Sequence, residues 1–337
     1  MNNHIFIIHT AFQEFIAESA ALLIKKDAPT DKFILASEIN ITKRKNSTWD
    51  KTIQLQSITP SSFGKHKTSL YNKNLLEINK AIQSPSQTTV YISDIQWPMN
   101  NRLFFDKKNN GAFDFSMIID GTLAYYNPQK SLYNYARDTL KYVAGVLGKG
   151  LPYHPYLGSV MGWERAKVSK VYGLNLHLSP IHPEKQINIE EMICKTTQLD
   201  KNKSIFLDQP FHNNMKPDDI KSLTTDTLNF LEQESINNIH YKAHHFSKEE
   251  HKNTFNFKEN KVLKTTECIE RIIQTHGFGT IISYNSTALF TLKTIYKDNI
   301  RCISLRDKCS RMNINVTSAK KIDKLFYNSG VELHEIG

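Results

Sequence analysis

The feature that most constrains the fold is the opening of the chain, where an apolar run passes directly into a helical pattern. Residues 4–9, HIFIIH, place four apolar side chains in a row, which is typical of a strand buried on both faces of a parallel sheet. From Thr10 onward apolar residues recur at helical spacing as far as Leu23, and Thr10 stands where a helix N-cap belongs. A strand that leads straight into a helix starts a β/α unit, so the sequence predicts an α/β fold.

The same alternation of strands and helices fills two halves of the chain. We predict further strands at 32–37, 89–93, 113–119, 168–174, 204–207, 238–242, 280–283 and 300–304. We predict helices at 70–82, 129–147, 223–231, 262–275, 286–296 and 318–327. A segment rich in glycine and proline at 148–162 separates the halves and is our candidate interdomain linker. We therefore expect two Rossmann-like, doubly wound domains facing a central cleft, at 1–155 and 165–317, with a C-terminal helix and tail at 318–337.

The balance of charge favours an anionic partner. The 337 residues include 43 lysines and arginines against 33 aspartates and glutamates, a formal net charge of +10, which suits a phosphorylated substrate or an anionic lipid surface. No helix-turn-helix, zinc-finger or RNP pattern accompanies the basic residues, so we do not expect nucleic acid binding. Four cysteines without a CxxC pair, short apolar runs and no leader pattern predict a cytoplasmic protein. The apolar stripe of 129–151 either packs in the core or docks on a membrane face.

Polar residues that directly follow predicted strands are the candidates for chemistry. They are Asp120-Gly121, Gln209, Lys242 with His244, and Asn285-Ser286-Thr287. The last group begins a helix, whose free N–H groups and positive dipole end bind phosphate, and a cation beside a departing phosphate stabilises its charge. Each group also has an ordinary explanation, as a turn, a chain exit, a surface histidine pair or an N-cap. A metal site at His240, His244 and His245 is disfavoured by the strand-and-loop context and the lack of a fourth ligand.

Taken in order, these motifs resemble those of bacterial sialyltransferases of the lipooligosaccharide and capsular polysialic-acid type. Those enzymes carry an acidic-acidic-glycine motif, a Lys-Pro-His-Pro motif and a Ser-Ser/Thr motif. The corresponding residues here are Ile119-Asp120-Gly121, Lys242-Ala243-His244-His245 and Ser286-Thr287. Residues 5–21 also look like the family's first β/α unit. This chain departs from the pattern twice, with Ile119 in place of the first acid and His245 in place of a proline.

The resemblance implies a GT-B fold and an inverting, metal-independent sialyltransferase that needs no cofactor. It implies transfer of sialic acid from CMP-sialic acid to a hydroxyl of a bacterial surface glycan, such as lipooligosaccharide, O-antigen or capsule. The net charge also fits a cytoplasmic enzyme that visits the anionic face of the inner membrane to reach a glycolipid acceptor. The alternatives are a GT-B glycosyltransferase that uses another CMP- or UDP-sugar, and a non-catalytic nucleotide- or lipid-binding protein.

The resemblance also assigns roles to residues. The N-terminal domain would bind the acceptor, with Asp120 as the base and with Thr10, Gln13 and Gly121 beside it. The C-terminal domain would bind CMP, with His244 as the partner of the leaving phosphate. The other implied donor-binding residues are Gln209, Lys242, Asn285, Ser286 and Thr287. Further candidates for the base are Asp94, Asp114 and Glu14.

Overall fold

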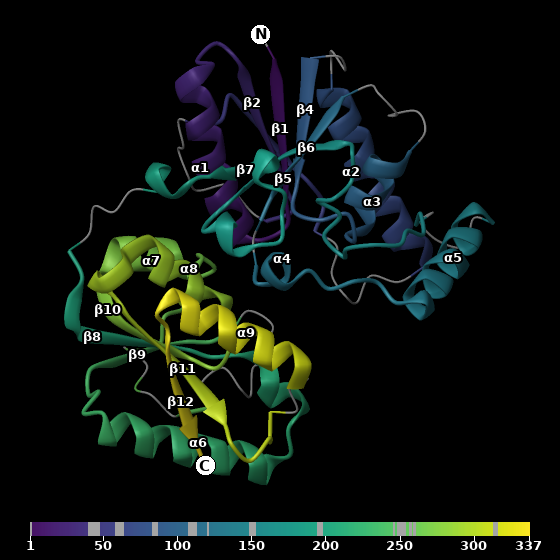
Figure 1. The fold of residues 1–337 in the computed structure, drawn as a ribbon. Coiled ribbons are helices and arrows are strands. Elements are labelled where there is room, and N and C mark those ends of the chain that lie inside the picture. The colour runs from purple at the N-terminus through teal and green to yellow at the C-terminus, as the bar shows by residue number, and fades with distance from the viewer. Residues whose placement is uncertain are drawn as a thin grey trace. The chain divides into compact units, whose positions relative to one another are not determined.

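The computed structural model divides into two compact units, Met1–Met192 and Ile193–Gly337 (Figure 1). It describes residues 2–39, 48–57, 64–82, 87–106, 113–119, 121–147, 153–193, 198–244, 247, 254–255, 258, 261–312 and 316–337. Within the described residues each unit has one parallel sheet with helices on both faces. The predicted α/β fold class is confirmed.

The first unit is built on a seven-stranded sheet in the order β3-β2-β1-β4-β5-β6-β7, counted over the described residues. Its strands are β1 (Asn3–Ile8), β2 (Lys32–Ser37), β3 (Lys51–Gln54), β4 (Thr88–Ile92), β5 (Asp114–Ile118), β6 (Val168–Gly173) and β7 (Gln186–Asn188). Its helices are α1 (Ala11–Asp27), α2 (Gly64–Ala81), α3 (Pro98–Phe105), α4 (Leu123–Tyr126) and α5 (Leu132–Val146). Helix α1 lies on one face of the sheet and α2 and α3 lie on the other (Figure 1).

The second unit has a five-stranded sheet in the order β12-β11-β10-β8-β9, again over the described residues. Its strands are β8 (Asp200–Leu207), β9 (Ile239–Lys242), β10 (Phe278–Ser283), β11 (Arg301–Asp307) and β12 (Glu332–Ile336). Its helices are α6 (Pro217–Gln233), α7 (Ile269–His276), α8 (Thr287–Tyr296) and α9 (Val316–Ser329). Short 3₁₀ turns lie at Leu176–Leu178, Pro183–Lys185, Glu190–Met192, Pro210–Asn214 and Lys297–Asn299. Helix α6 covers one face, and α7 and α8 lie on the other (Figure 1).

Strand order reverses once in each sheet, and this point positions any ligand. In the first unit the chain runs outward from β1 through β2 to β3 and then resumes on the other side of β1 with β4. In the second unit it runs from β8 to β9 and then resumes on the other side of β8 with β10. Open α/β sheets bind ligands beyond the carboxyl ends of their strands at such a switch point. A ligand site is therefore expected beyond the carboxyl ends of β1 and β4 in the first unit, and of β8 and β10 in the second.

The boundary between the units lies later than the sequence predicted. The expected linker at 148–162 contributes to the first core, in which Tyr153, Tyr156 and Met161 are buried. Strand β6, expected in a second domain starting at 165, pairs with β5 in the first sheet. A composition rich in glycine and proline marks irregular backbone, but Tyr153 and Tyr156 within this segment anchor it in the first core.

The C-terminal residues 318–337 are part of the second sheet and not an appended tail. Strand β12 pairs in parallel with β11, with Ile303 level with Glu332 and Asp307 level with Ile336. Its short sequence, ELHEI, mixes polar and apolar residues and contains no apolar run. This is typical of a strand at the edge of a sheet, and β12 is an edge strand. Among the described helices, none combines the length and the apolar character that a passage through a bilayer requires.

Candidate active site

The candidate site lies at the carboxyl edge of the second sheet, where three strands end at one level. Leu207 on β8 is level with Lys242 on β9 and with Ser283 on β10. The Ser283 hydroxyl donates a 2.6 Å hydrogen bond to the Leu207 carbonyl, which ties the ends of β8 and β10 together. The residues that follow leave the sheet at the same edge. The structure thus brings to one edge, at the switch point, the predicted donor-binding residues Gln209, Lys242, His244, Asn285, Ser286 and Thr287.

Helix α8 begins at this edge and presents its N-terminus there. Asn285 turns the chain from β10 into the helix with a left-handed backbone (φ 51°), a conformation that asparagine tolerates better than most residues. The Ser286 hydroxyl accepts from the N–H of Ala288 at 3.4 Å, so it is the N-cap. The Oδ1 atom of Asn285 is buried, and no described residue gives it a hydrogen bond. A ten-residue helix with this start can bind one phosphate through its dipole and free N–H groups.

The end of β8 is fixed by a buried carboxylate that sequence reasoning missed. Asp208 accepts a 2.5 Å hydrogen bond from the Tyr241 hydroxyl, and its Oδ1 accepts from the Gln209 N–H at 2.8 Å. Burial and the neighbouring Asp208 charge raise the pKa of Tyr241, which therefore stays protonated and donates. Asp208 holds the backbone that carries Gln209. Its place directly after a buried strand was the available signal.

The end of β9 pairs a lysine with a second carboxyl group that the sequence did not mark. Burial lowers the pKa of Lys242, whose Nζ lies 3.5 Å from the Thr265 carbonyl oxygen. Glu270, in the first turn of α7, is buried, and burial raises its pKa to about 7. A hydrogen bond with the Cys268 side chain and the positive charge of Lys242 oppose that rise. Near neutral pH this carboxyl is part-protonated, so it compensates the Lys242 cation only in part. Lys242, the last residue of β9, is therefore a candidate partner for an anionic ligand at this edge of the sheet.

The histidines differ in their positions around β9. His244 lies two residues beyond the strand and is half-buried, and its carbonyl accepts the Ser247 N–H at 2.9 Å. His240 lies within the strand, where its ring packs at 5.0 Å from the Phe278 ring and burial lowers its pKa. His245 lies outside the described residues. Over the part of the chain that the structure describes, no group of three or more His, Cys, Asp or Glu residues is placed to hold a metal ion.

The predicted acceptor-side residues lie in the first unit, except that Asp120 falls outside the described residues. The Thr10 hydroxyl accepts the Gln13 N–H at 3.1 Å, and the Gln13 side-chain oxygen accepts the His9 N–H at 2.6 Å. These bonds satisfy the start of α1, so the N-cap interpretation of Thr10 holds. A Cβ added at Gly121 would meet no atom within 4 Å, so packing does not require glycine there.

A histidine and a glutamate that sequence reasoning missed lie near the switch point of the first unit. His9 follows β1 and Glu38 follows β2, with 3.3 Å between Nδ1 and Oε1 and both side chains almost fully buried. The His9 ring packs 4.8 Å from the Trp97 ring. A carboxylate beside an imidazole is a frequent arrangement in general bases, but neither His9 Nδ1 nor Glu38 Oε1 has a hydrogen-bond partner among the described residues. Both residues stand directly after buried strands, the same signal that selected the candidates in the second half.

The further candidates for the base have other positions. Asp94 follows β4, but its Oδ1 accepts the N–H groups of Gln96 and Trp97 at 2.7 Å each, which makes it the cap of a turn. Asp114 is the first residue of β5, so it lies at the amino edge of the sheet, away from the switch point. Glu14 is buried in the first turn of α1.

Comparison with known proteins identifies the fold. No family model matches the chain, and no curated protein sequence matches it. A Photobacterium sp. JT-ISH-224 2,6-sialyltransferase, solved with CMP and lactose, is 12% identical with a TM-score of 0.58, covering 98% of this chain and 78% of that one. The GT-B domain of a Photobacterium damselae sialyltransferase is 11% identical with a TM-score of 0.55, covering 99% and 100%. A Neisseria meningitidis UDP-GlcNAc 2-epimerase bound to UDP-GlcNAc is 11% identical with a TM-score of 0.50, covering 98% and 95%. Likeness at these identities shows the fold alone, which is GT-B.

Proposed function

We propose that the chain is an inverting sialyltransferase that moves sialic acid from CMP-sialic acid to a hydroxyl of a bacterial surface glycan or glycolipid. The observation that carries the proposal is the helix N-terminus at the switch point of the second sheet, a feature that suits one phosphate. There α8, capped by Ser286, begins after β10, and Lys242 ends β9 at the same edge of the sheet, with the end of β8 between them. CMP is a leaving group with one phosphate, and the order of the motifs matches that of the resembled family. Sialyltransferases are among the proteins that share the fold.

The chemistry follows from the groups at this edge. As the bond to sialic acid breaks, negative charge grows on the CMP phosphate, and preorganised N–H groups, hydroxyls and cations stabilise it. In our proposal these are the start of α8 with Ser286 and Thr287, and the cations Lys242 and His244. Gln209 and Asn285 would contact the nucleoside. The proposal needs no divalent ion, because these groups already supply positive charge to the leaving phosphate.

The acceptor is activated from the first unit. Asp120, which follows β5 in the sequence by two residues, would take the proton of the attacking hydroxyl, while Thr10, Gln13 and Gly121 would line the acceptor side. Attack on the face opposite the leaving phosphate inverts the configuration. A positioned base or acid typically contributes on the order of 10²–10⁴ in rate, so Asp120→Asn and His244→Ala should each reduce kcat/KM by at least about tenfold.

The test measures CMP release from CMP-sialic acid, with and without acceptors ending in galactose, N-acetylgalactosamine or sialic acid. We expect acceptor-dependent release that EDTA leaves unchanged, and a rise in Tm with CMP. Ser286→Ala should weaken CMP binding, whereas Ser131→Ala, which removes the comparable N-cap of α5, should not. Absence of both CMP release and a Tm rise with CMP would refute the proposal.

The second candidate is an enzyme of the same architecture acting on a UDP-sugar. It is favoured by the UDP-GlcNAc 2-epimerases among the proteins of this fold, one of which covers 98% of this chain. A parallel measurement with UDP and UDP-GlcNAc separates the two. Stabilisation by UDP but not by CMP would select the second candidate.

A further inference from the structure

Helix α5 carries its apolar face outward. Leu132, Leu140 and Leu147 are 76%, 72% and 67% exposed, and Tyr133 and Val146 are also exposed. At 3.6 residues per turn, positions 132, 136, 140, 143 and 147 form one stripe along the helix. Packing of this stripe in the core, the first of the two interpretations given for 129–151, is contradicted by these exposures.

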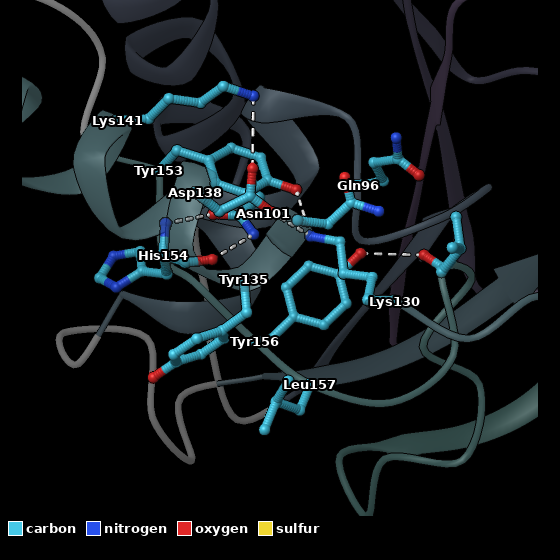
Figure 2. Close-up of polar contacts among 12 residues, drawn as sticks. Gln96, Asn101, Lys130, Tyr135, Asp138, Lys141, Tyr153, His154, Tyr156 and Leu157 are labelled. Carbon is cyan, nitrogen blue, oxygen red and sulfur yellow. Dashed lines mark hydrogen bonds and ion pairs between the residues drawn. The ribbon is translucent and has the colours of Figure 1, made fainter. Parts of the chain in front are cut away.

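The opposite, polar face holds α5 against the first unit. Asp138 is buried in an ion pair with Lys130, whose ammonium group lies over the Tyr156 ring at 3.7 Å and the Tyr153 ring at 5.2 Å (Figure 2). Gly145, on the same side as Asp138, is also buried. An ordinary surface helix buries its apolar stripe and exposes its polar one. Here the arrangement is reversed, and a buried ion pair holds it in place.

The charges around the stripe are basic. Asp138 is the sole acidic residue in the sequence of α5, and it is buried. The exposed charged residues are Arg137, which lies beside the apolar stripe, and Lys141, which lies further round the helix with its ammonium group 3.3 Å from an Asp138 carboxylate oxygen. A helix with an apolar face, tyrosines and basic neighbours is suited to the interface of a membrane. Basic side chains beside that interface attract anionic headgroups.

We propose that α5 docks the first unit on an anionic lipid bilayer, with the helix axis along the surface and the stripe inserted among the headgroups. A second copy of the chain fits less well, because facing copies would bring their arginines and lysines together. The area is also small: 15 residues span about 22 Å and are about 10 Å across, so the face offers roughly 220 Å². A stable protein interface needs about 800 Å² from each partner.

The test is co-sedimentation of the full chain with vesicles of phosphatidylcholine mixed with phosphatidylglycerol, and with vesicles of phosphatidylcholine alone. Two basic side chains near an anionic surface predict binding to the mixed vesicles about thirtyfold tighter than to the neutral ones. Leu140→Glu should weaken binding to the mixed vesicles by at least about tenfold, and Arg137→Gln by about fivefold. Because both side chains are exposed, an unchanged Tm will show that the variants fold.

The matched control is Leu76→Glu, which places the same change at a 55% exposed leucine on α2 and should bind vesicles like the wild type. CMP release with a soluble acceptor should be the same in Leu140→Glu and the wild type, which separates this proposal from the proposed activity. Wild-type binding by Leu140→Glu, or equal binding to both vesicle types, would overturn the lipid assignment. A wild-type dimer that Leu140→Glu makes monomeric, without vesicle binding, would assign the stripe to a second copy instead.

Discussion

Replacing Glu270 by glutamine should remove a pH dependence from the stability of the second unit. Glu270 is buried at the start of α7, and burial raises its pKa from an ordinary 4.5 to about 7. The nearby Lys242 has its pKa lowered by burial, so both members of the pair are shifted toward their neutral forms. The fold tolerates the ionised carboxylate poorly even with a cation beside it.

The sign follows from the direction of the shift. Because the folded state binds this proton more tightly than the unfolded chain, the contribution to stability is fully present below pH 4.5 and is lost as pH rises through 7. The shift of about 2.5 pKa units corresponds to about 3 kcal/mol, at 1.36 kcal/mol per unit. Most of this loss of unfolding free energy, about 2.5 kcal/mol, occurs between pH 5 and pH 8. Glutamine cannot titrate, so the free energy of unfolding of Glu270→Gln should lack this decline.

The assay is urea unfolding of both proteins at pH 5 and pH 8, followed by far-ultraviolet circular dichroism. We expect the variant to gain about 2.5 kcal/mol relative to the wild type between the two pH values. The three tryptophans, Trp49, Trp97 and Trp163, all lie in the first unit, so their fluorescence follows that unit separately. Glu232→Gln, at an exposed position on α6, is the control and should change stability by less than about 0.5 kcal/mol. A difference between Glu270→Gln and the wild type that is the same at both pH values would refute the reasoning.

Three further predictions concern single contacts. Asp138→Ala should destabilise the first unit by about 3–5 kcal/mol in urea unfolding, because it leaves the buried Lys130 ammonium without its partner. Adding Lys130→Met should recover most of that loss. Equal stability of the single and double variants would contradict this. Lys242→Met should raise the Kd for CMP about tenfold by calorimetry, and an unchanged Kd would remove Lys242 from the donor site. Asn285→Ala should cost about 1 kcal/mol of unfolding free energy, while Asn285→Gly should cost less, because only the alanine is strained at φ 51°.

The sequence predicted those parts of the fold in which local pattern and burial agree. The corner between β10 and α8 is the best case, since a continuous apolar strand, a serine cap and a helical pattern follow one another without interruption. Asn285, Ser286 and Thr287 consequently lie at the edge where they were expected. The roles assigned to them remain predictions.

Other features were hidden because they depend on contacts distant in sequence. Helical periodicity shows which residues of α5 share a face, but the outward direction of that face is set by Asp138 and Lys130. Glu270 lies in an unremarkable helical turn, and its pKa is raised by burial in the folded unit, which no local pattern reveals. The late unit boundary follows from the pairing of β6 with β5, which no local pattern encodes.

The strand orders have a consequence for how the chain can be assembled during synthesis. In both sheets, over the described residues, the first strand made is an interior one, and every later strand pairs with a strand that has already been made. No strand has to wait for a partner that the ribosome has not yet produced, and none has to be inserted into a finished sheet. Domains generally fold as units from the N-terminus. Ribosome-bound chains arrested well beyond residue 192 should therefore already protect the amides of β1 and β4 from exchange, before the second sheet exists.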